Sequence, residues 1–290
     1  MSSFSNILNP VILKELANAW IKEDLPNFDL GAALAADEEV VAKIYCKSDG
    51  VLAGIPFANA VFNELNCSPN WCFNEGEHLK GTPTTEVAYV GGKAQRVLLA
   101  ERTVLNTISR CSGVATTAKR IKNKLQHVNW NGYLAGTRKT TPGFRIVEKY
   151  GLLIGGASTH RYDLSNMIML KDNHINICGG SIKSAVEQTR AVAGFVNKIE
   201  VECRSHKEVV EAASAGVDIV MLDNFSVKDA KASSLWLKQR QPEILIEVSG
   251  GITEENILDY AVPTVDIISM GCLVQGYQTV DFSMKILTSK

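Results

Sequence analysis

Short runs of aliphatic and β-branched residues recur along the second half of the chain, and each run ends in a polar or glycine-bearing turn. Near-continuous apolar runs of this kind are typical of parallel strands that are buried on both faces. Stretches with helical periodicity separate most of them, which predicts alternating strands and helices. The runs are YLAGTRK from Tyr133, MIMLKDN from Met167, KIEVEC from Lys198, DIVMLDN from Asp218, ILIEVSGG from Ile244 and DIISMG from Asp266, and the helical stretches are 181–195, 206–215, 227–240 and 253–261.

The ends of these runs are spaced like βα units. They lie 33, 32, 21, 26 and 20 positions apart when they are taken as Thr137, Leu170, Glu202, Asp223, Ser249 and Ser269. This spacing favours a TIM-like α/β barrel, in which reactive groups lie at the C-terminal ends of the strands. Because only six runs are clear, we expect an incomplete barrel. A flavodoxin-like open sheet is the alternative, since it has the same alternation and also binds ligands at strand ends.

The first part of the chain has a different pattern, which predicts a smaller α+β sandwich domain. Glu39–Cys46 alternates as a strand, Ser48-Asp49-Gly50 signals a turn, and Val51–Ile55 resumes the extended pattern. A further strand is expected at Glu86–Val90, and it should end at Gly91-Gly92.

A long helical pattern from Gln95 to about Lys124 links the two parts of the chain. Gly113 within it indicates either a close packing contact or a break. We place the N-terminal domain and this bridging helix at 1–115 and the barrel at 116–275. The C-terminal tail, about 276–290, is expected to pack on the N-terminal domain.

Five cationic or ionisable side chains gather between Gly136 and His174, while the formal net charge of the whole chain is only -1. Such local positive charge predicts an anionic small molecule and argues against nucleic acid as a partner. Three other charges of the segment, at Arg145, Glu148 and Lys149, fit a solvated helix face. The clustered residues are Arg138, Lys139, His160, Arg161 and Lys171.

Several protein classes are disfavoured by the composition. The seven cysteines form no CxxC pair, which argues against a zinc or disulfide framework. Met1–Pro10 lacks the features of a signal peptide, and no apolar stretch reaches the roughly 18 residues that a membrane span requires. We therefore expect a soluble cytoplasmic protein with no membrane partner, and leave a nuclear location open.

The ends of the third and fourth runs carry Glu202 and Asp223, beside Lys139 and Lys171 on the expected rim. These carboxylates either form structural ion pairs or bind sugar hydroxyls and a magnesium ion. Glu200, two residues earlier, would point the same way on a strand and is the rival of Glu202 for that role.

Two glycine-bearing turns follow the last two runs, at Ser249-Gly250-Gly251 and Ser269-Met270-Gly271. Either could be a plain turn, but late-strand loops of TIM-type barrels commonly hold phosphate through backbone N–H groups. No GxxxxGK[ST] or strand-coupled GxGxxG is present, so a nucleoside triphosphate has little support. Together with the cations and the carboxylates, these turns indicate a phosphorylated sugar as ligand.

Several longer motifs resemble the quinolinate phosphoribosyltransferase family. The likeness runs from about Glu39 to Leu287, with the motifs in the family's order. They are AERTVLNTISRCSGVAT from Ala100, GTRKTTPG from Gly136, GGASTHRYDLSNMIMLKDNH from Gly155, EVEC from Glu200, MLDNF from Met221 and SGGI from Ser249. The resemblance implies transfer of phosphoribosyl from phosphoribosyl pyrophosphate to quinolinate with decarboxylation, which gives nicotinate mononucleotide, pyrophosphate and CO2 for NAD synthesis.

The resemblance also implies roles for individual residues. Quinolinate would be held by Arg102, Arg138, Lys139, His160, Arg161 and Lys171. Phosphoribosyl pyrophosphate would be held by Glu202, Asp223, Ser249, Gly250, Gly251 and Gly271. Lys139, Lys171, Glu202 and Asp223 would be catalytic, with Mg²⁺ bound at Glu202 and Asp223 directly or through water. The family further implies a homodimer or higher homo-oligomer with shared active sites, in which Arg102 of one subunit serves the barrel of another.

Departures from the family pattern are modest. EDLPNFDLG at Glu23–Gly31 replaces a common glycine-containing acidic loop, and CLVQ at Cys272–Gln275 has Val274 where threonine is frequent. Three other functions stay open: an aldolase-type lyase with Lys171 as Schiff-base lysine, a relative that uses another pyridine without decarboxylation, and a catalytically silent metabolite-binding protein.

Overall fold

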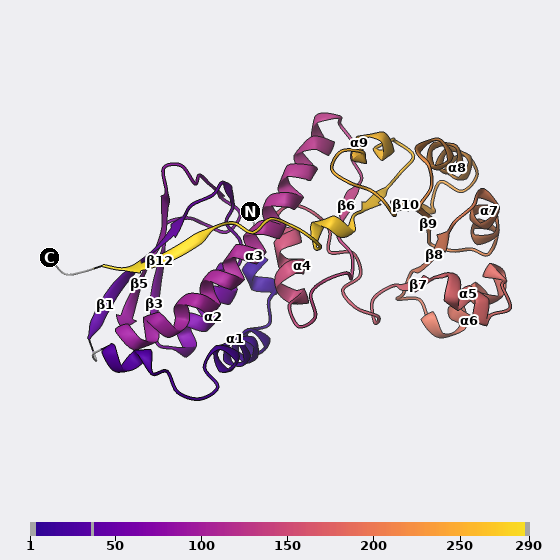
Figure 1. The fold of residues 1–290 in the computed structure, drawn as a ribbon. Helices are drawn as coiled ribbons and strands as arrows, with labels where there is room; N and C mark the ends of the chain where they lie inside the picture. Colours follow the sequence, from indigo (N-terminus) through magenta and orange to yellow (C-terminus); the bar gives the residue numbers. More distant parts are fainter. Residues whose placement is uncertain (1–3, 36–37, 288–290) are drawn as a thin grey trace. The chain divides into compact units, whose positions relative to one another are not determined.

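A computed structural model describes residues 4–35 and 38–287 of the 290-residue chain (Figure 1). The start of Met1–Pro10 and the last three residues of the 276–290 tail thus lie outside the described residues. The chain divides into two compact units, and each is made of separate segments. The first unit takes in residues up to 119, 142–156 and the residues from 277, and the second takes in 120–141 and 157–276.

The first unit is built on an antiparallel sheet with the strand order β12-β1-β5-β3. The C-terminal strand completes it, because Ala42 of β1 pairs with Ile286 of β12, and Figure 1 shows β12 alongside β1 and β5. One buried core joins the sheet to the helices, with Ile44, Phe62 and Val104 fully buried in it. The elements of this unit before the bridging helix are η1 Phe4–Ile7, α1 Pro10–Asp24, η2 Gly31–Leu34, β1 Glu39–Cys46, β2 Gly50–Val51, α2 Ile55–Glu64, β3 Ser68–Trp71, β4 His78–Leu79 and β5 Thr85–Lys93, and β12 is Phe282–Ile286.

The predicted extended stretch at Val51–Ile55 is largely wrong. Only Gly50 and Val51 pair as a strand, with β4, and α2 already begins at Ile55. Pro56 explains the early helix start, because its fixed φ suits the first turn and its missing N–H is not needed there. The strand predicted at Glu86–Val90 is present but continues through both glycines to Lys93.

The long bridging helix is α3, Ala94–His127, and it runs without a break through Gly113. The glycine marks a close packing contact, since a Cβ there would overlap the backbone oxygen of Gln278 and crowd the ring of Tyr277. A side chain at this position would push the returning C-terminal segment away from the helix.

Helix α4, Arg145–Ile154, is also part of the first unit. The expected solvated face is wrong for two of its charges, because Glu148 is 0% and Lys149 is 1% exposed. Tyr277 of the C-terminal segment donates a hydrogen bond to Glu148 at 3.0 Å. The C-terminal segment therefore covers part of a helix that the local sequence pattern shows as amphipathic.

The second unit contains a parallel sheet of six strands, and all six predicted runs form strands in it. Its strands are almost wholly buried, for example four of the five residues of β9, as expected for sheets covered on both faces. The strands are β6 Tyr133–Ala135, β7 Ile168–Leu170, β8 Ile199–Cys203, β9 Ile219–Asp223, β10 Leu245–Ser249 and β11 Ile267–Ser269.

The strand order distinguishes the two predicted architectures. It reads β6-β11-β10-β9-β8-β7, so the first strand pairs with the last and the others follow in chain order. A doubly wound sheet would instead reverse direction at an internal switch point. The sheet therefore curls as a barrel that stays open between β6 and β7, and the prediction of an incomplete TIM-like barrel is confirmed while the flavodoxin-like alternative is wrong.

Helices connect successive strands of the barrel, and three of them begin at a serine cap. The side chains of Ser181, Ser205 and Ser226 each accept a hydrogen bond from the backbone N–H three residues later, which satisfies a donor that the first turn leaves free. The helices of this unit are α5 Asp172–Ile177, α6 Ile182–Ala193, α7 His206–Ser214, α8 Val227–Arg240 and α9 Ile257–Tyr260, and a short η3 covers Gly271–Leu273. Among the described residues, no helix combines the length and the apolar character needed to cross a bilayer.

Candidate active site

A cavity of about 570 Å³, here called the barrel pocket, lies at the C-terminal ends of the parallel strands. Its walls come from the strands β7 to β11, from the turns that follow β6, β7, β9 and β10, and from the segment at His160 and Arg161. This is the place where barrels of this type carry their reactive groups. Ten residues predicted from the sequence line it, namely Arg138, Lys139, His160, Arg161, Lys171, Glu202, Asp223, Ser249, Gly250 and Gly251.

Two predicted residues are not among those that line the barrel pocket. Gly271 begins η3, and a Cβ at this position would lie 3.4 Å from Cδ of Lys139, so it borders a lining residue. Arg102 is exposed on α3 and belongs to the first unit. The pocket within the second unit is thus formed without Arg102.

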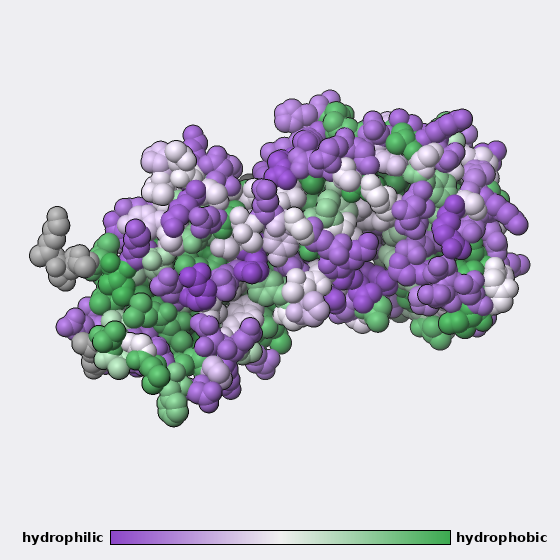
Figure 2. Space-filling model, in the orientation of Figure 1, coloured by the Kyte–Doolittle hydropathy of each residue, from purple (hydrophilic) through white to green (hydrophobic). Residues whose placement is uncertain are grey.

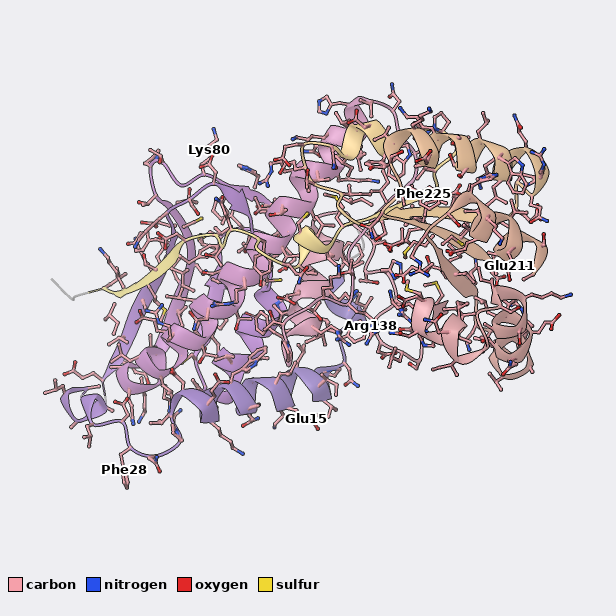
Figure 3. All side chains as sticks on the ribbon, turned by 45° about the vertical axis from the view of Figure 1, so that its right-hand side comes forward. Glu15, Phe28, Lys80, Arg138, Glu211 and Phe225 are labelled. Carbon is pink, nitrogen blue, oxygen red and sulfur yellow. The ribbon has the colours of Figure 1, made fainter. Side chains whose placement is uncertain are left out.

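Two guanidinium groups, those of Arg138 and Arg161, share one side of the pocket. Burial lowers the pKa of Arg161, and the positive charge of Arg138 lowers it further. The Nε of Arg138 is buried and has no hydrogen-bond partner among the described residues. Because like charges at close range and an unpaired buried donor are both costly, this side of the pocket calls for an anionic ligand. Figure 3 labels Arg138.

The carboxylates Glu202 and Asp223 lie on the pocket wall as well. Glu202 accepts a hydrogen bond from the ammonium of Lys171, and Asp223 accepts one from the side chain of Asn224 at 2.9 Å. The ion pair foreseen as one alternative is therefore present at Glu202. Both residues still line the cavity, so their oxygens remain available to a ligand or a hard cation.

Glu200 does not compete with Glu202 for the pocket. Its side chain points the same way along β8, but it is 0% exposed and does not line the cavity, whereas the Glu202 side chain is 18% exposed. Burial and the neighbouring Glu247 raise the pKa of Glu200 well above its ordinary value. Burial therefore favours the neutral form of Glu200 inside the barrel.

The turn after β10 has the geometry of an anion-binding loop. Gly250 and Gly251 have φ values of 87° and 64°, which residues with a side chain rarely adopt. A Cβ on Gly250 would also overlap the side chain of Asn224, while the space beside Gly251 is open. Because Gly251 has open space beside it, an oxyanion can approach the backbone closely there.

Sequence reasoning missed one acidic residue of the pocket, Glu247 on β10. It is 1% exposed, accepts a hydrogen bond from Ser269 at 2.5 Å and lies 3.0 Å from Nε2 of His160. The sequence contained a signal for Glu247. It lies two positions before Ser249 on the same strand, just as Glu200 lies two positions before Glu202, so the two side chains of each pair point into the barrel. A charged residue inside a buried apolar run is expected to have a polar or charged partner, because unpaired charges are almost never fully buried.

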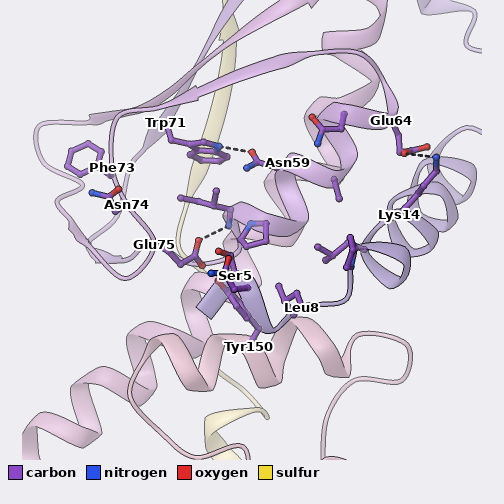
Figure 4. A pocket seen from close by; sticks show the side chains of 17 residues that line it. Ser5, Leu8, Lys14, Asn59, Glu64, Trp71, Phe73, Asn74, Glu75 and Tyr150 are labelled. Atoms are coloured by element: carbon purple, nitrogen blue, oxygen red, sulfur yellow. Dashed lines mark hydrogen bonds and ion pairs between the residues drawn. The ribbon is translucent and has the colours of Figure 1, made fainter. Parts of the chain in front are cut away.

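A second cavity, of about 720 Å³, lies within the first unit (Figure 4). It is lined by residues of α1, α2 and β3, and none of the predicted site residues takes part. Its polar groups largely bond one another, as Trp71 donates to Asn59 at 2.8 Å and Lys14 lies 3.7 Å from Glu64. The convergent cations and carboxylates of the barrel pocket make that pocket the candidate for chemistry.

Glu75 beside this second cavity should make stability depend on pH. Its carboxyl accepts the backbone N–H groups of Gly54 and Ile55, yet burial raises its pKa from 4.5 to about 7. The unfolded chain loses this proton near pH 4.5 and the folded chain keeps it until about 7, so stability should fall as pH rises across that window. In Glu75→Gln this part of the pH dependence should disappear, as urea unfolding at several pH values would measure.

The absolute stability of Glu75→Gln should fall at every pH, because the amide offers one acceptor oxygen for two backbone donors. The informative quantity is therefore the slope with pH. Glu77→Gln removes the same charge at an exposed position and should keep the wild-type slope. An unchanged slope in Glu75→Gln would show that the buried carboxyl does not titrate in this range.

Fold and pocket together define an α/β-barrel protein with an anion site at its strand ends. Family models described as quinolinate phosphoribosyl transferase match the chain over residues 114–285, for the C-terminal domain, and 29–112, for the N-terminal domain. The chain belongs to the quinolinate phosphoribosyltransferase family.

Curated relatives agree over nearly the whole chain. Nicotinate-nucleotide pyrophosphorylases (carboxylating) from Rattus norvegicus and Homo sapiens are each 45% identical to it, over 97% and 98% of this chain and 93% and 95% of theirs. Among solved structures, the nicotinate-nucleotide pyrophosphorylase from Francisella tularensis has a TM-score of 0.89 at 30% identity and covers 99% of this chain and 100% of its own. The likeness therefore includes both units.

Proposed function

We propose that this protein transfers the phosphoribosyl group of phosphoribosyl pyrophosphate to quinolinate with decarboxylation. The products are nicotinate mononucleotide, pyrophosphate and CO2, which places the reaction in NAD biosynthesis. The observation that carries this proposal is that Arg138 and Arg161 both line the barrel pocket, where the Nε of Arg138 is buried without a hydrogen-bond partner among the described residues. Quinolinate has two adjacent carboxylates, and planar guanidinium groups bind carboxylates in bidentate geometry.

The second substrate fits the opposite part of the same pocket. The open backbone at Gly251, together with Ser249 and Gly250, suits the 5-phosphate. Glu202 and Asp223 would bind the ribose hydroxyls and hold Mg²⁺, since carboxylates are the oxygen ligands that this ion prefers alongside substrate phosphates. When bound, the ion would neutralise charge on the pyrophosphate that leaves.

The protein's own residues then act by position and charge. Departure of pyrophosphate leaves positive charge on the ribose C1, which Glu202 and Asp223 stabilise from the pocket wall. Lys139 and Lys171 also line the pocket and would reach both anionic ligands. After transfer, the pyridine nitrogen is cationic and stabilises the carbanion left by loss of CO2. The carbanion then takes up a proton from solvent, so no covalent protein nucleophile is needed.

A Schiff-base lyase fits the pocket less well. A nucleophilic lysine has to be neutral, and enzymes achieve this by desolvation or by a neighbouring cation. Lys171 instead donates a hydrogen bond to the carboxylate of Glu202, and its side chain is 42% exposed, so it lacks the desolvated environment of a Schiff-base lysine. Borohydride trapping of a substrate adduct on Lys171 would support the lyase and contradict our proposal.

The direct test incubates the protein with quinolinate, phosphoribosyl pyrophosphate and Mg²⁺. Equimolar release of CO2 and nicotinate mononucleotide is the expected result. Nucleotide formation from another pyridine without CO2 would indicate the non-decarboxylating relative. Binding of both ligands without product would indicate a silent binding protein, and omission of Mg²⁺ tests the ion's part.

We further propose a homodimer as the smallest active unit. Phe28, Leu30 and Leu34 follow α1 with 88%, 84% and 93% of their surfaces exposed, an apolar segment that a second subunit would shield. Apolar surface is visible over the first unit in Figure 2, and Figure 3 shows Phe28 projecting from the ribbon. Arg102, exposed on α3 of the same unit, would then serve the barrel pocket of the partner.

Mixing two inactive variants should restore activity if sites are shared. A dimer of one Arg102→Ala chain and one Arg138→Ala chain would contain one site with both changes and one site with neither, so activity should return to at most about half per dimer. Turnover after verified subunit exchange is the measurement. No recovery would mean that Arg102 serves its own chain or only its fold.

A further inference from the structure

A chain of hydrogen bonds inside the barrel connects the two halves of the pocket. It starts at Ser249 in the glycine turn, whose hydroxyl lies 3.0 Å from that of Ser269. Ser269 donates to one oxygen of Glu247 at 2.5 Å, and the other oxygen lies 3.0 Å from Nε2 of His160. The last link is the backbone N–H of Arg161, which donates to Nδ1 of His160 at 2.8 Å. Glu247 is thus the centre of the chain.

The bonds of His160 assign its ring proton. Because the Arg161 N–H is a donor, Nδ1 must accept, and the proton resides on Nε2. Nε2 points at Glu247, so the ring donates to that carboxylate. Both nitrogens of His160 are engaged within the protein, and the ring side chain is only 9% exposed. Its ring is therefore a link in the framework of the pocket.

The backbone at His160 needs this support. Its φ of 57° lies in the left-handed region, which is strained for a residue with a side chain and persists only where neighbours enforce it. On one side, Ser158 anchors the turn, since it exchanges backbone bonds of 2.7 and 2.9 Å with Leu134 and Gly136. On the other side, the ring reaches across to Glu247. The strained turn is what places Arg161 in the pocket.

This step rests on the proposed function. We propose that Glu247 is a positioning residue, whose buried carboxylate fixes His160 and thereby the strained turn that presents Arg161 to a carboxylate of quinolinate. Through Ser269 the same carboxylate also orders Ser249 beside the 5-phosphate. Glu200, 4.0 Å from His160, is the other acidic group at this ring, but its distance exceeds a hydrogen bond.

The first test compares Glu247→Ala with Glu247→Gln. Alanine removes the acceptor of His160, so KM for quinolinate should rise about tenfold or more, with a smaller change in KM for phosphoribosyl pyrophosphate. Glutamine can accept from His160 with its oxygen and donate to Ser269 with its amide, so it should restore quinolinate KM to within about threefold of wild type. Equal losses for both substrates, or no rescue by glutamine, would overturn the proposal.

A double-mutant cycle separates positioning from general damage. If Glu247 acts through Arg161, Glu247→Ala should weaken quinolinate binding little further in an Arg161→Ala background. Additive losses would contradict this. Ser234→Ala is the matched control, because it removes a buried 2.7 Å hydrogen bond, to Thr264, away from the pocket; it should lower stability and leave quinolinate binding unchanged.

A spectroscopic readout is independent of catalysis and of variant stability. The ¹⁵N shifts of His160 in the wild-type protein should show the proton on Nε2, and Glu247→Gln should retain this form. A proton on Nδ1 in the wild type would overturn the inference. If the wild type bound no quinolinate, the proposed function would fail, while the nitrogen shifts would still decide whether Glu247 holds the ring.

Discussion

Joint conversion of Glu202 to glutamine and Asp223 to asparagine should lower turnover by on the order of 1,000-fold, while quinolinate still binds. The amides keep the size of both side chains but remove the two negative charges nearest the developing ribosyl cation. They also leave a weaker oxygen set for Mg²⁺. Single-turnover kinetics at saturating substrates and calorimetric titration of quinolinate measure the two quantities.

The ion pair of Lys171 with Glu202 suggests an alternative that this experiment can test, namely a purely structural role for the carboxylates. If these carboxylates only hold the lysine, the double amide variant should keep near-normal turnover once Mg²⁺ is saturating. Glu187→Gln with Asp259→Asn is a matched control, since it removes the same two charges from exposed positions on α6 and α9. The control should keep full activity, which separates a local role from an effect of net charge.

The barrel strands were largely predictable because the sequence pattern that defines each strand is local. Each strand from β6 to β11 is an apolar run that ends in a polar turn, and each run can be read without knowing its neighbours. Strand order is different, because the pairing of β6 with β11 joins residues more than 130 positions apart. Only the structure could distinguish the curled sheet from a doubly wound one.

Errors in the first unit come from contacts that are distant in sequence. Glu148 and Lys149 read as solvated because their helix is amphipathic, but the C-terminal segment returns and Tyr277 bonds Glu148. No local pattern contains that return. The error at Val51–Ile55 has a local cause, since a short run of apolar residues fits a strand or a buried helix start equally well.

The site was predictable where charge stands at a strand end and was missed where charge lies inside a strand. Arg138, Lys171 and Asp223 follow apolar runs, so the barrel rule places them at the mouth. Glu247 lies within such a run, and its partner His160 comes from a turn with a left-handed backbone that no sequence rule foresees. The hydrogen-bonded framework behind the pocket could therefore be found only from the structure, whereas most residues that line the pocket could be predicted from the sequence.

Replacement of Arg161 by alanine should weaken quinolinate binding about 10- to 150-fold, because a charge-assisted hydrogen bond to a carboxylate is typically worth about 1.5–3 kcal/mol. Arg138→Ala should act in the same way, and the double variant should bind no measurable quinolinate. Phosphoribosyl pyrophosphate should bind with nearly unchanged affinity, since its phosphate meets the glycine turn. Calorimetric titration of each ligand separately measures this difference.

Arg161→Lys distinguishes charge from shape. Lysine keeps the positive charge but lacks the planar fork, so its quinolinate affinity should lie between those of alanine and arginine. Lys228→Ala, at an exposed position on α8, removes one positive charge that does not line the pocket and should change neither ligand's affinity. A dicarboxylate can offer one negative charge to each of the two guanidinium groups. Equal losses for both ligands, or a loss for the sugar phosphate alone, would place the phosphate and not the dicarboxylate between them.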